Sequence, residues 1–117
     1  MNRVILILIS IMIGISAFSA NDDYNTRQAR QYTQEAEYYQ KKADNYRREA
    51  QYSLKQAENY QRAAAYYTRK GDSDRAQDYT RRASRAMDSY KTQMRYAANA
   101  DDKAVDYLKR TARLLQN

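Results

Sequence analysis

Cysteine, histidine, tryptophan and proline are absent from this 117-residue chain, and glycine occurs only twice. Without cysteine the chain can form no disulfide and no thiolate metal site. Without histidine or cysteine, a serine nucleophile would need lysine or a carboxylate as its base, and the sequence suggests no such set. It contains no glycine-rich phosphate loop, and Asp72, Asp74 and Asp78 lack the glycine and glutamate of a calcium loop. We therefore expect a non-enzymatic protein with no cofactor, no metal and no small-molecule substrate.

Large aliphatic side chains are scarce beyond the N-terminus. After residue 20 only seven remain, namely Leu54, Met87, Met94, Val105, Leu108, Leu114 and Leu115. Tyrosine, present 13 times, must therefore supply much of the buried apolar area, at roughly 150–250 Å² for each covered ring. Few residues break helices, and alanine, glutamine and arginine favour them. The composition predicts an all-α fold.

Residues 1–20 have the pattern of a secretory signal peptide. A short basic segment with Arg3 precedes an apolar run and a stretch of small side chains. Ala17 and Ser19 suit cleavage after Ser19, and cleavage after Ala20 is the second option. The alternative is an uncleaved membrane anchor, because the apolar stretch is just long enough to span a bilayer. In either case the remainder is expected outside the cytoplasm, in the periplasm, at the cell surface or secreted.

A seven-residue pattern fills the first half of the exported part. Alanine recurs at 29, 36, 43, 50, 57 and 64, and tyrosine follows three residues later in every case except Ser53. With alanine at heptad position a and tyrosine at position d, the pattern describes a coiled-coil seam that combines small and large side chains. The strict period predicts a left-handed supercoil. We expect a helix over about residues 24–70.

Gly71 and Asp72 mark the turn. Gly71 suits the left-handed position after a helix, and Asp72 or Ser73 can cap the next one. The Ala/Tyr pattern then resumes to about residue 115. The sequence thus predicts one domain, residues 21–117, that forms a long antiparallel two-helix hairpin.

The second helix, over about residues 73–115, leaves two questions open. A break at residues 99–102 is the alternative to one continuous helix.

The e positions of the second helix hold Met87, Met94, Leu108 and Leu115. We expect a single Ala/Tyr seam to leave these side chains uncovered, and an exposed apolar stripe usually marks a contact. Pairing of two hairpins would give a four-helix bundle.

The stretch around the turn resembles one tetratricopeptide unit. The matching residues are Tyr60, Ala63, Ala64, Tyr67, Gly71, Ala76 and Ala83. Thr80 departs from the family pattern where an aromatic residue is expected, and no 34-residue repeat follows. The resemblance covers 24 residues and implies a helix–turn–helix, with no function attached.

The outer face of the first helix carries the candidate binding residues. Tyrosine recurs every 14 residues at position c, which lies on the solvent side of the helix, and each of these tyrosines has a basic residue three places on. Six of the seven f positions are basic. The candidate stripe comprises Tyr24, Arg27, Tyr38, Lys41, Tyr52, Lys55, Tyr66 and Arg69. The alternative is that these charges form an ordinary solvated face, supported by acidic residues four places before several of them.

Two functions from different classes follow. The leading hypothesis is a non-catalytic protein of the cell envelope or the medium that acts by helix–helix association, with itself or with a helical partner. The second is binding of an anionic polymer, such as nucleic acid, lipopolysaccharide or an acidic glycan. Apart from Arg3, the chain has 20 basic and 14 acidic residues, a charge of +6 beyond the signal segment. A membrane-surface peptide is disfavoured, because these helices lack a Leu/Phe/Trp face.

Overall fold

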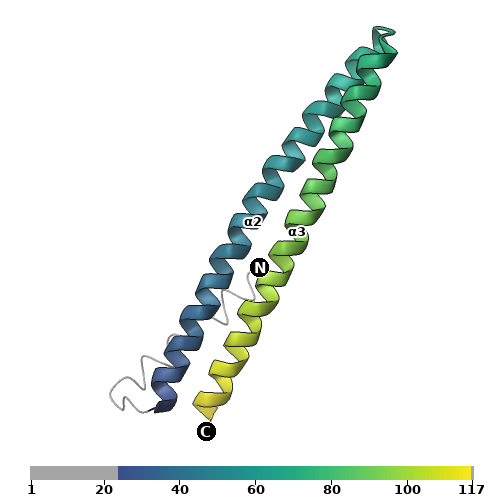
Figure 1. Cartoon of the computed structure of the whole chain (residues 1–117). Helices are drawn as coiled ribbons and strands as arrows, with labels where there is room; N and C mark the ends of the chain where they lie inside the picture. Colours follow the sequence, from purple (N-terminus) through teal and green to yellow (C-terminus); the bar gives the residue numbers. More distant parts are fainter. Residues whose placement is uncertain (1–23, 117) are drawn as a thin grey trace. The chain divides into compact units, whose positions relative to one another are not determined.

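The computed structural model describes residues 24–116. Helix α2, Tyr24–Arg69, and helix α3, Ser73–Gln116, run antiparallel as a hairpin (Figure 1). The expected all-α hairpin is therefore confirmed, whereas the four-helix bundle stays a prediction. The signal segment and its cleavage site lie outside the described residues. α3 continues as one helix through residues 99–102.

The turn combines the end of one helix with the start of the next. The Gly71 amide donates to the Thr68 carbonyl at 3.1 Å, and the Asp72 amide donates to the Tyr67 carbonyl at 2.9 Å, which together form a Schellman motif. Gly71 has a φ of 77°, the left-handed conformation that this motif requires. A carboxylate oxygen of Asp72 accepts from the Arg75 amide at 3.2 Å, so Asp72 is the N-cap of α3.

Five of the six seam alanines of α2 are fully buried, and Ala64 is half-buried. Ala29, Ala36, Ala43, Ala50 and Ala57 expose at most 1% of their surface. The d tyrosines beside them are half-buried. Alanine at a thus lies at the centre of the helix contact, and the rings lie at its edge, where a phenol oxygen can still reach water.

By its internal contacts the hairpin divides into two units, which are described separately. The first consists of residues 24–43 and 98–116, and the second of residues 44–97. In unit 1 the Tyr107 ring lies between Tyr32 and Tyr39, with both centroid distances 5.9 Å. In unit 2 the Tyr79 ring lies between Tyr60 and Tyr67, at 6.1 and 5.5 Å.

Position e also belongs to the buried face, contrary to expectation. Leu108, at position e of α3, exposes only 2% of its surface, and Met87 and Leu115 are half-buried, so the hairpin itself covers most of the expected apolar stripe. Met94 alone among the four stays exposed, at 36%. In α2 the e residues of unit 1, Thr26, Thr33 and Gln40, are buried as well. In unit 2 the e residues Arg47 and Leu54 are half-buried, and Gln61 and Thr68 are exposed. The large rings at d are displaced to one side of the alanine line, and position e fills the other side.

Candidate functional site

The four tyrosines expected on the outer face of α2 are exposed. The exposed fractions are 71% for Tyr24, 55% for Tyr38, 66% for Tyr52 and 47% for Tyr66. Tyr24 and Tyr38 belong to unit 1, and the other two belong to unit 2. These rings lie away from the alanine seam and remain accessible to a partner.

The cations that contact these rings differ from those expected. Lys42 Nζ lies 5.6 Å from the centroid of the Tyr38 ring, and Lys70 Nζ lies 5.6 Å from that of Tyr66. The contacting lysine is thus four residues after the tyrosine, one place beyond the expected Lys41 and Arg69. A side chain on a helix leans towards the N-terminus, so a residue four places on can reach back over the ring.

Tyr52 departs from this arrangement. The residue four places after it is Gln56, whose amide donates to the Tyr52 hydroxyl at 3.0 Å. For Tyr24 the structure shows no cation over the ring among residues 24–116. The four tyrosines are therefore alike in exposure but not in their partners, and only Tyr38 and Tyr66 form cation–π pairs on this face.

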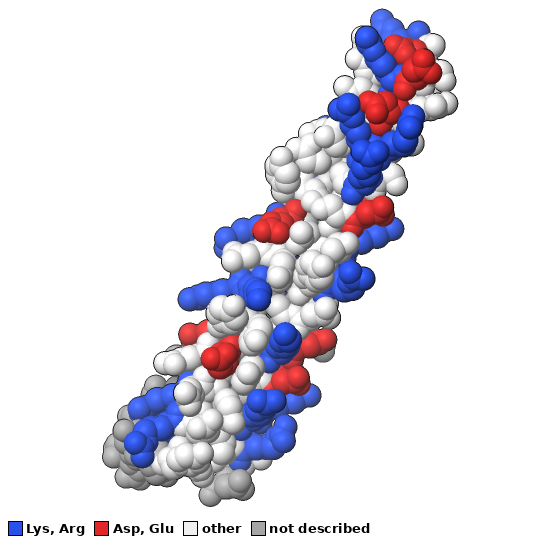
Figure 2. Space-filling model, viewed as in Figure 1, with Lys and Arg blue, Asp and Glu red and all other residues white. Residues whose placement is uncertain are grey.

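The basic residues at position f are exposed too. Arg27 and Lys41 lie in unit 1, and Lys55 and Arg69 lie in unit 2. On the face shown in Figure 2, lysine and arginine side chains are interspersed with aspartate and glutamate. The surface is therefore net basic without a continuous single-sign patch on that face.

Two aromatic clusters inside the hairpin were not anticipated from the sequence. In unit 1, Arg110 lies over Tyr107 at 5.0 Å and Lys103 over Tyr39 at 5.2 Å. In unit 2, Arg82 lies over Tyr79 at 5.2 Å and Arg75 over Tyr67 at 5.4 Å. The two clusters match position by position with an offset of 28 along each helix, and Lys103 corresponds to Arg75. The repeat of Asp-x-Ala-x-Asp-Tyr-x-x-Arg at 74 and at 102, spaced by four heptads, was the signal that could have revealed them.

No protein-family model, curated protein or solved structure matches this chain. The function therefore has to be argued from the geometry of the hairpin alone.

A shallow groove of about 640 Å³ opens in unit 2, where the tyrosine pattern is interrupted. Ser53 stands where the heptad would place a tyrosine, and its hydroxyl oxygen lies 3.2 Å from that of Ser89 on α3. Without a ring at this level, the edge of the seam is hollow. The lining residues are Tyr52, Ser53, Gln56, Tyr60, Arg82, Arg85, Ala86 and Ser89.

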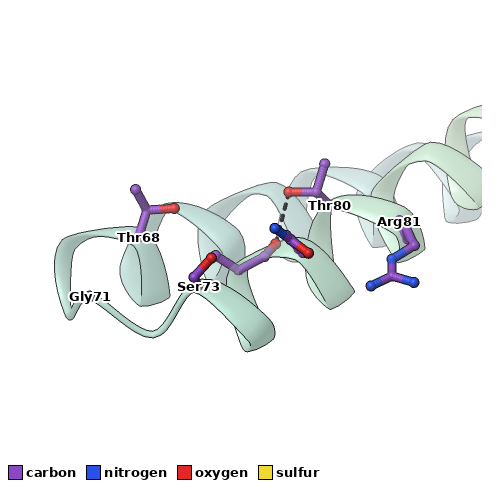
Figure 3. Close-up of a pocket in the computed structure, with 7 residues that line it drawn as sticks. Thr68, Gly71, Ser73, Thr80 and Arg81 are labelled. Atoms are coloured by element: carbon purple, nitrogen blue, oxygen red, sulfur yellow. Dashed lines mark hydrogen bonds between the residues drawn. The ribbon is translucent and has the colours of Figure 1, made fainter.

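A second hollow, of about 530 Å³, lies beside the turn (Figure 3). Thr68, Gly71, Ser73, Thr80 and Arg81 are among the residues that line it. The Thr80 hydroxyl is occupied by a 2.8 Å hydrogen bond to the Ala76 carbonyl. The lining thus combines one cation with small polar side chains, and these do not form a nucleophile–base pair.

Residues 24–116 contain neither a metal-binding cluster nor a membrane-spanning helix. No group of acidic side chains there could hold a metal ion. Neither α2 nor α3 has a stretch apolar enough to cross a membrane.

Proposed function

We propose that this chain is an exported, non-catalytic protein that acts by association of its helical hairpin with another helical surface. The observation that supports this function is the composition of the core. Among the described residues, the buried hydrophobic side chains are nine alanines and Leu108. Export is supported by the sequence pattern of the first 20 residues.

So thin a core provides little stability. Each buried CH₂ contributes about 0.8 kcal/mol, whereas ordering the backbone of one residue costs about 1–2 kcal/mol. A single small core rarely supplies more than about 3–5 kcal/mol of net stability. Burial against a second helical surface would add the apolar contacts that one hairpin lacks.

The apolar part of the exposed surface consists mainly of aromatic side chains. The exposed large hydrophobic residues of the described part are Tyr24, Tyr38, Tyr52, Tyr66, Met94 and Tyr96. Tyrosine provides a large contact area with few rotatable bonds, and it is enriched at the centres of protein interfaces.

Sedimentation velocity of the purified protein over a range of concentrations tests this proposal. We expect a helical oligomer that weakens only in part at 1 M salt, because ions screen exposed charge pairs but not apolar contacts. A helical monomer at every concentration, with a melting temperature independent of concentration, would contradict self-association.

Binding of an anionic polymer is the second candidate function, and the Tyr38–Lys42 and Tyr66–Lys70 pairs favour it. An exposed ring with an adjacent ammonium group combines stacking with phosphate or carboxylate attraction. The test is fluorescence anisotropy with a labelled single-stranded oligonucleotide at low and high salt. The triple variant Tyr38→Gln/Tyr52→Gln/Tyr66→Gln should bind less tightly, whereas Tyr96→Gln on α3 should bind as the native chain does. Equal binding by the triple variant would eliminate this candidate.

A further inference from the structure

The outer face of α3 has a pattern of charges that form no ion pairs within the described hairpin. Its charged f positions, here called the outer stripe of α3, are Asp74, Arg81, Asp88, Arg95, Asp102 and Lys109. The sign of the charge alternates strictly along these six positions, and all six side chains are exposed. Within residues 24–116 none of them forms an ion pair. Arg95 contacts the neighbouring Tyr96 ring at 5.8 Å.

Neighbouring charges on the same helix explain this alternation only in part. The residue four places on has the same sign in four of the six cases, namely Asp74/Asp78, Arg81/Arg85, Asp102/Asp106 and Lys109/Arg113. Residues four apart are neighbours on a helix, so each such pair destabilises it. In α2 the equivalent spacing joins opposite charges, as in Glu37/Lys41 and Glu58/Arg62. Residues three places away have the opposite sign beside Arg81, Asp88 and Lys109. Asp74, Arg95 and Asp102 have no opposite charge three or four places away in α3, so their signs are not explained within the helix.

We propose that the outer stripe of α3 docks against the same stripe of a second copy of the chain, with the two helices antiparallel. This inference rests on the proposed helix–helix association and specifies its partner. Asp88 of each copy then faces Arg95 of the other, Arg81 faces Asp102, and Asp74 faces Lys109. The two residue numbers of each pair add to 183, so all three pairs have the same midpoint, between residues 91 and 92. A single two-fold axis at this midpoint therefore places each of the six stripe charges opposite a charge of the other sign. A contact of this kind closes on itself and gives a dimer.

Other arrangements of the same stripe fit less well. Parallel helices in register would place like charges opposite each other. A parallel contact shifted by seven residues would match the charges but leave open ends, and such contacts grow into filaments. The outer face of α2 cannot pair with itself in this way, because six of its seven f positions are basic. An anionic polymer would be repelled by every second residue of the α3 stripe.

Side chains beside the stripe permit a close approach. Position b of α3 is occupied in its second half by Ala98, Val105 and Ala112. Short side chains there let two helix backbones come near each other. At the axis position b holds Lys91, whose exposed ammonium group must extend towards solvent, away from its own copy. Exposed ion pairs contribute little affinity individually, so the stripe chiefly determines the register and orientation of the pair.

Two charge-reversal variants of the full chain test the proposal. The first combines Asp88→Lys with Asp102→Lys, and the second combines Arg81→Glu with Arg95→Glu. In each variant alone, the proposed pairs would bring like charges together, and we expect the dissociation constant of the dimer to rise at least about tenfold. When the two variants are mixed, every proposed pair again joins opposite charges. Sedimentation equilibrium should then show a 1:1 dimer with an affinity close to that of the native chain.

The matched controls make the same charge changes on α2. Arg48→Glu/Arg62→Glu and Glu49→Lys/Glu58→Lys change exposed positions outside the proposed contact, so each should dimerise as the native chain does. If the α3 variants self-associate as tightly as the native chain, the stripe is not the interface, although helix–helix association still stands. A native chain that is monomeric throughout would overturn both proposals.

Orientation is tested independently by cysteine cross-linking, since the chain contains no cysteine of its own. Lys91→Cys lies at the proposed axis and should form a disulfide with its own copy under oxidation. Gln77→Cys lies 14 residues away, which separates the two thiols by roughly 40 Å in the antiparallel dimer. Efficient cross-linking through both positions would mean that the helices are parallel and in register, and cross-linking through position 77 alone would place the axis elsewhere. Either result would overturn the proposal.

Discussion

At the scale of single residues, the rings of the tyrosines at position d pack alternately from the two helices. Tyr79 lies between Tyr60 and Tyr67, which are one heptad apart, and its ring is parallel to that of Tyr67 within 2°. Arg82 lies over the same ring. One side chain thus takes part in two aromatic contacts and one cation–π contact, which helps to offset the shortage of aliphatic residues.

Replacing Tyr79 should therefore reduce stability more than replacing an exposed tyrosine. Each aromatic pair contributes about 0.5–1.5 kcal/mol beyond its buried area, so Tyr79→Leu should lower the free energy of unfolding by roughly 1–3 kcal/mol. Tyr107→Leu should have a similar effect, because Tyr107 holds the equivalent place in unit 1. Tyr24→Leu, at a ring that is 71% exposed, is the control and should change stability by less than about 0.5 kcal/mol. Urea denaturation followed by circular dichroism measures all three.

Gly71 provides a second test at the residue scale. A Cβ atom at this position would meet no atom within 4 Å, so any cost of a side chain arises from the backbone angle alone. Gly71→Ala should lower the free energy of unfolding by about 1–2 kcal/mol, and Gly71→Val should lower it further because a β-branched residue resists positive φ. Gly71→Asn should recover part of the loss, since asparagine tolerates this conformation. Equal stability of the alanine variant and the native chain would show that the Schellman turn is not maintained.

At the scale of the helices, alanine at position a allows the two backbones to approach closely. In unit 1, the hydroxyl oxygen of Thr111 on α3 lies 3.5 Å from the backbone carbonyl oxygen of Ala29 on α2, and 3.0 Å from the carbonyl of Tyr107 on its own helix. A side chain of α3 thus reaches the backbone of α2 directly. Such an approach leaves no room for a larger residue at the seam.

Enlarging a seam alanine should consequently be unfavourable. Ala50 is fully buried in unit 2, and Ala50→Leu should lower the free energy of unfolding by about 1–3 kcal/mol through overpacking. Ala65, at the outer b position of the same helix, is exposed, and Ala65→Leu should be nearly neutral. Thermal melts of the two variants make the comparison. If both substitutions had the same effect, the assignment of alanine to the seam would be incorrect.

The sequence was sufficient to predict the elements because alanine, tyrosine and glycine mark them unambiguously. The burial of threonine and glutamine at position e could not be predicted from the sequence, for a physical reason. Threonine and glutamine there look like solvent-facing residues, yet the Thr33 hydroxyl donates to the Ala29 carbonyl at 2.8 Å. A threonine that satisfies its hydroxyl within its own helix can be buried at little cost, and periodicity does not reveal this.

The candidate site was predictable only in part. The exposure of Tyr38 and Tyr66 follows from heptad position, whereas their contacts with Lys42 and Lys70 depend on how side chains lean along the helix. Sequence spacing alone gives both the third and the fourth following residue as neighbours, so it could not choose between Lys41 and Lys42.

At the scale of the whole molecule, the two helices present different charge patterns to solvent. The outer face of α2 is basic at nearly every f position, and that of α3 alternates in sign. The chain as a whole has a net charge of +7, which opposes random association of copies. Association through the α3 stripe is compatible with this charge, because it brings opposite signs together in one register and keeps the basic faces of α2 free of the contact.

A thin core combined with a defined dimer contact makes the stability of the protein depend on its concentration. If copies pair only when folded, dimerisation and folding are linked by mass action, and a tenfold increase in concentration adds about 1.4 kcal/mol per mole of dimer. For helices of this size, that should raise Tm by roughly 3–5 °C. Calorimetry at several protein concentrations measures the shift. The Asp88→Lys/Asp102→Lys variant should melt at a lower temperature with a weaker concentration dependence, whereas Glu58→Lys should follow the native chain. A Tm that is the same at all concentrations would show that one hairpin is stable by itself, despite a core of alanines and a single leucine.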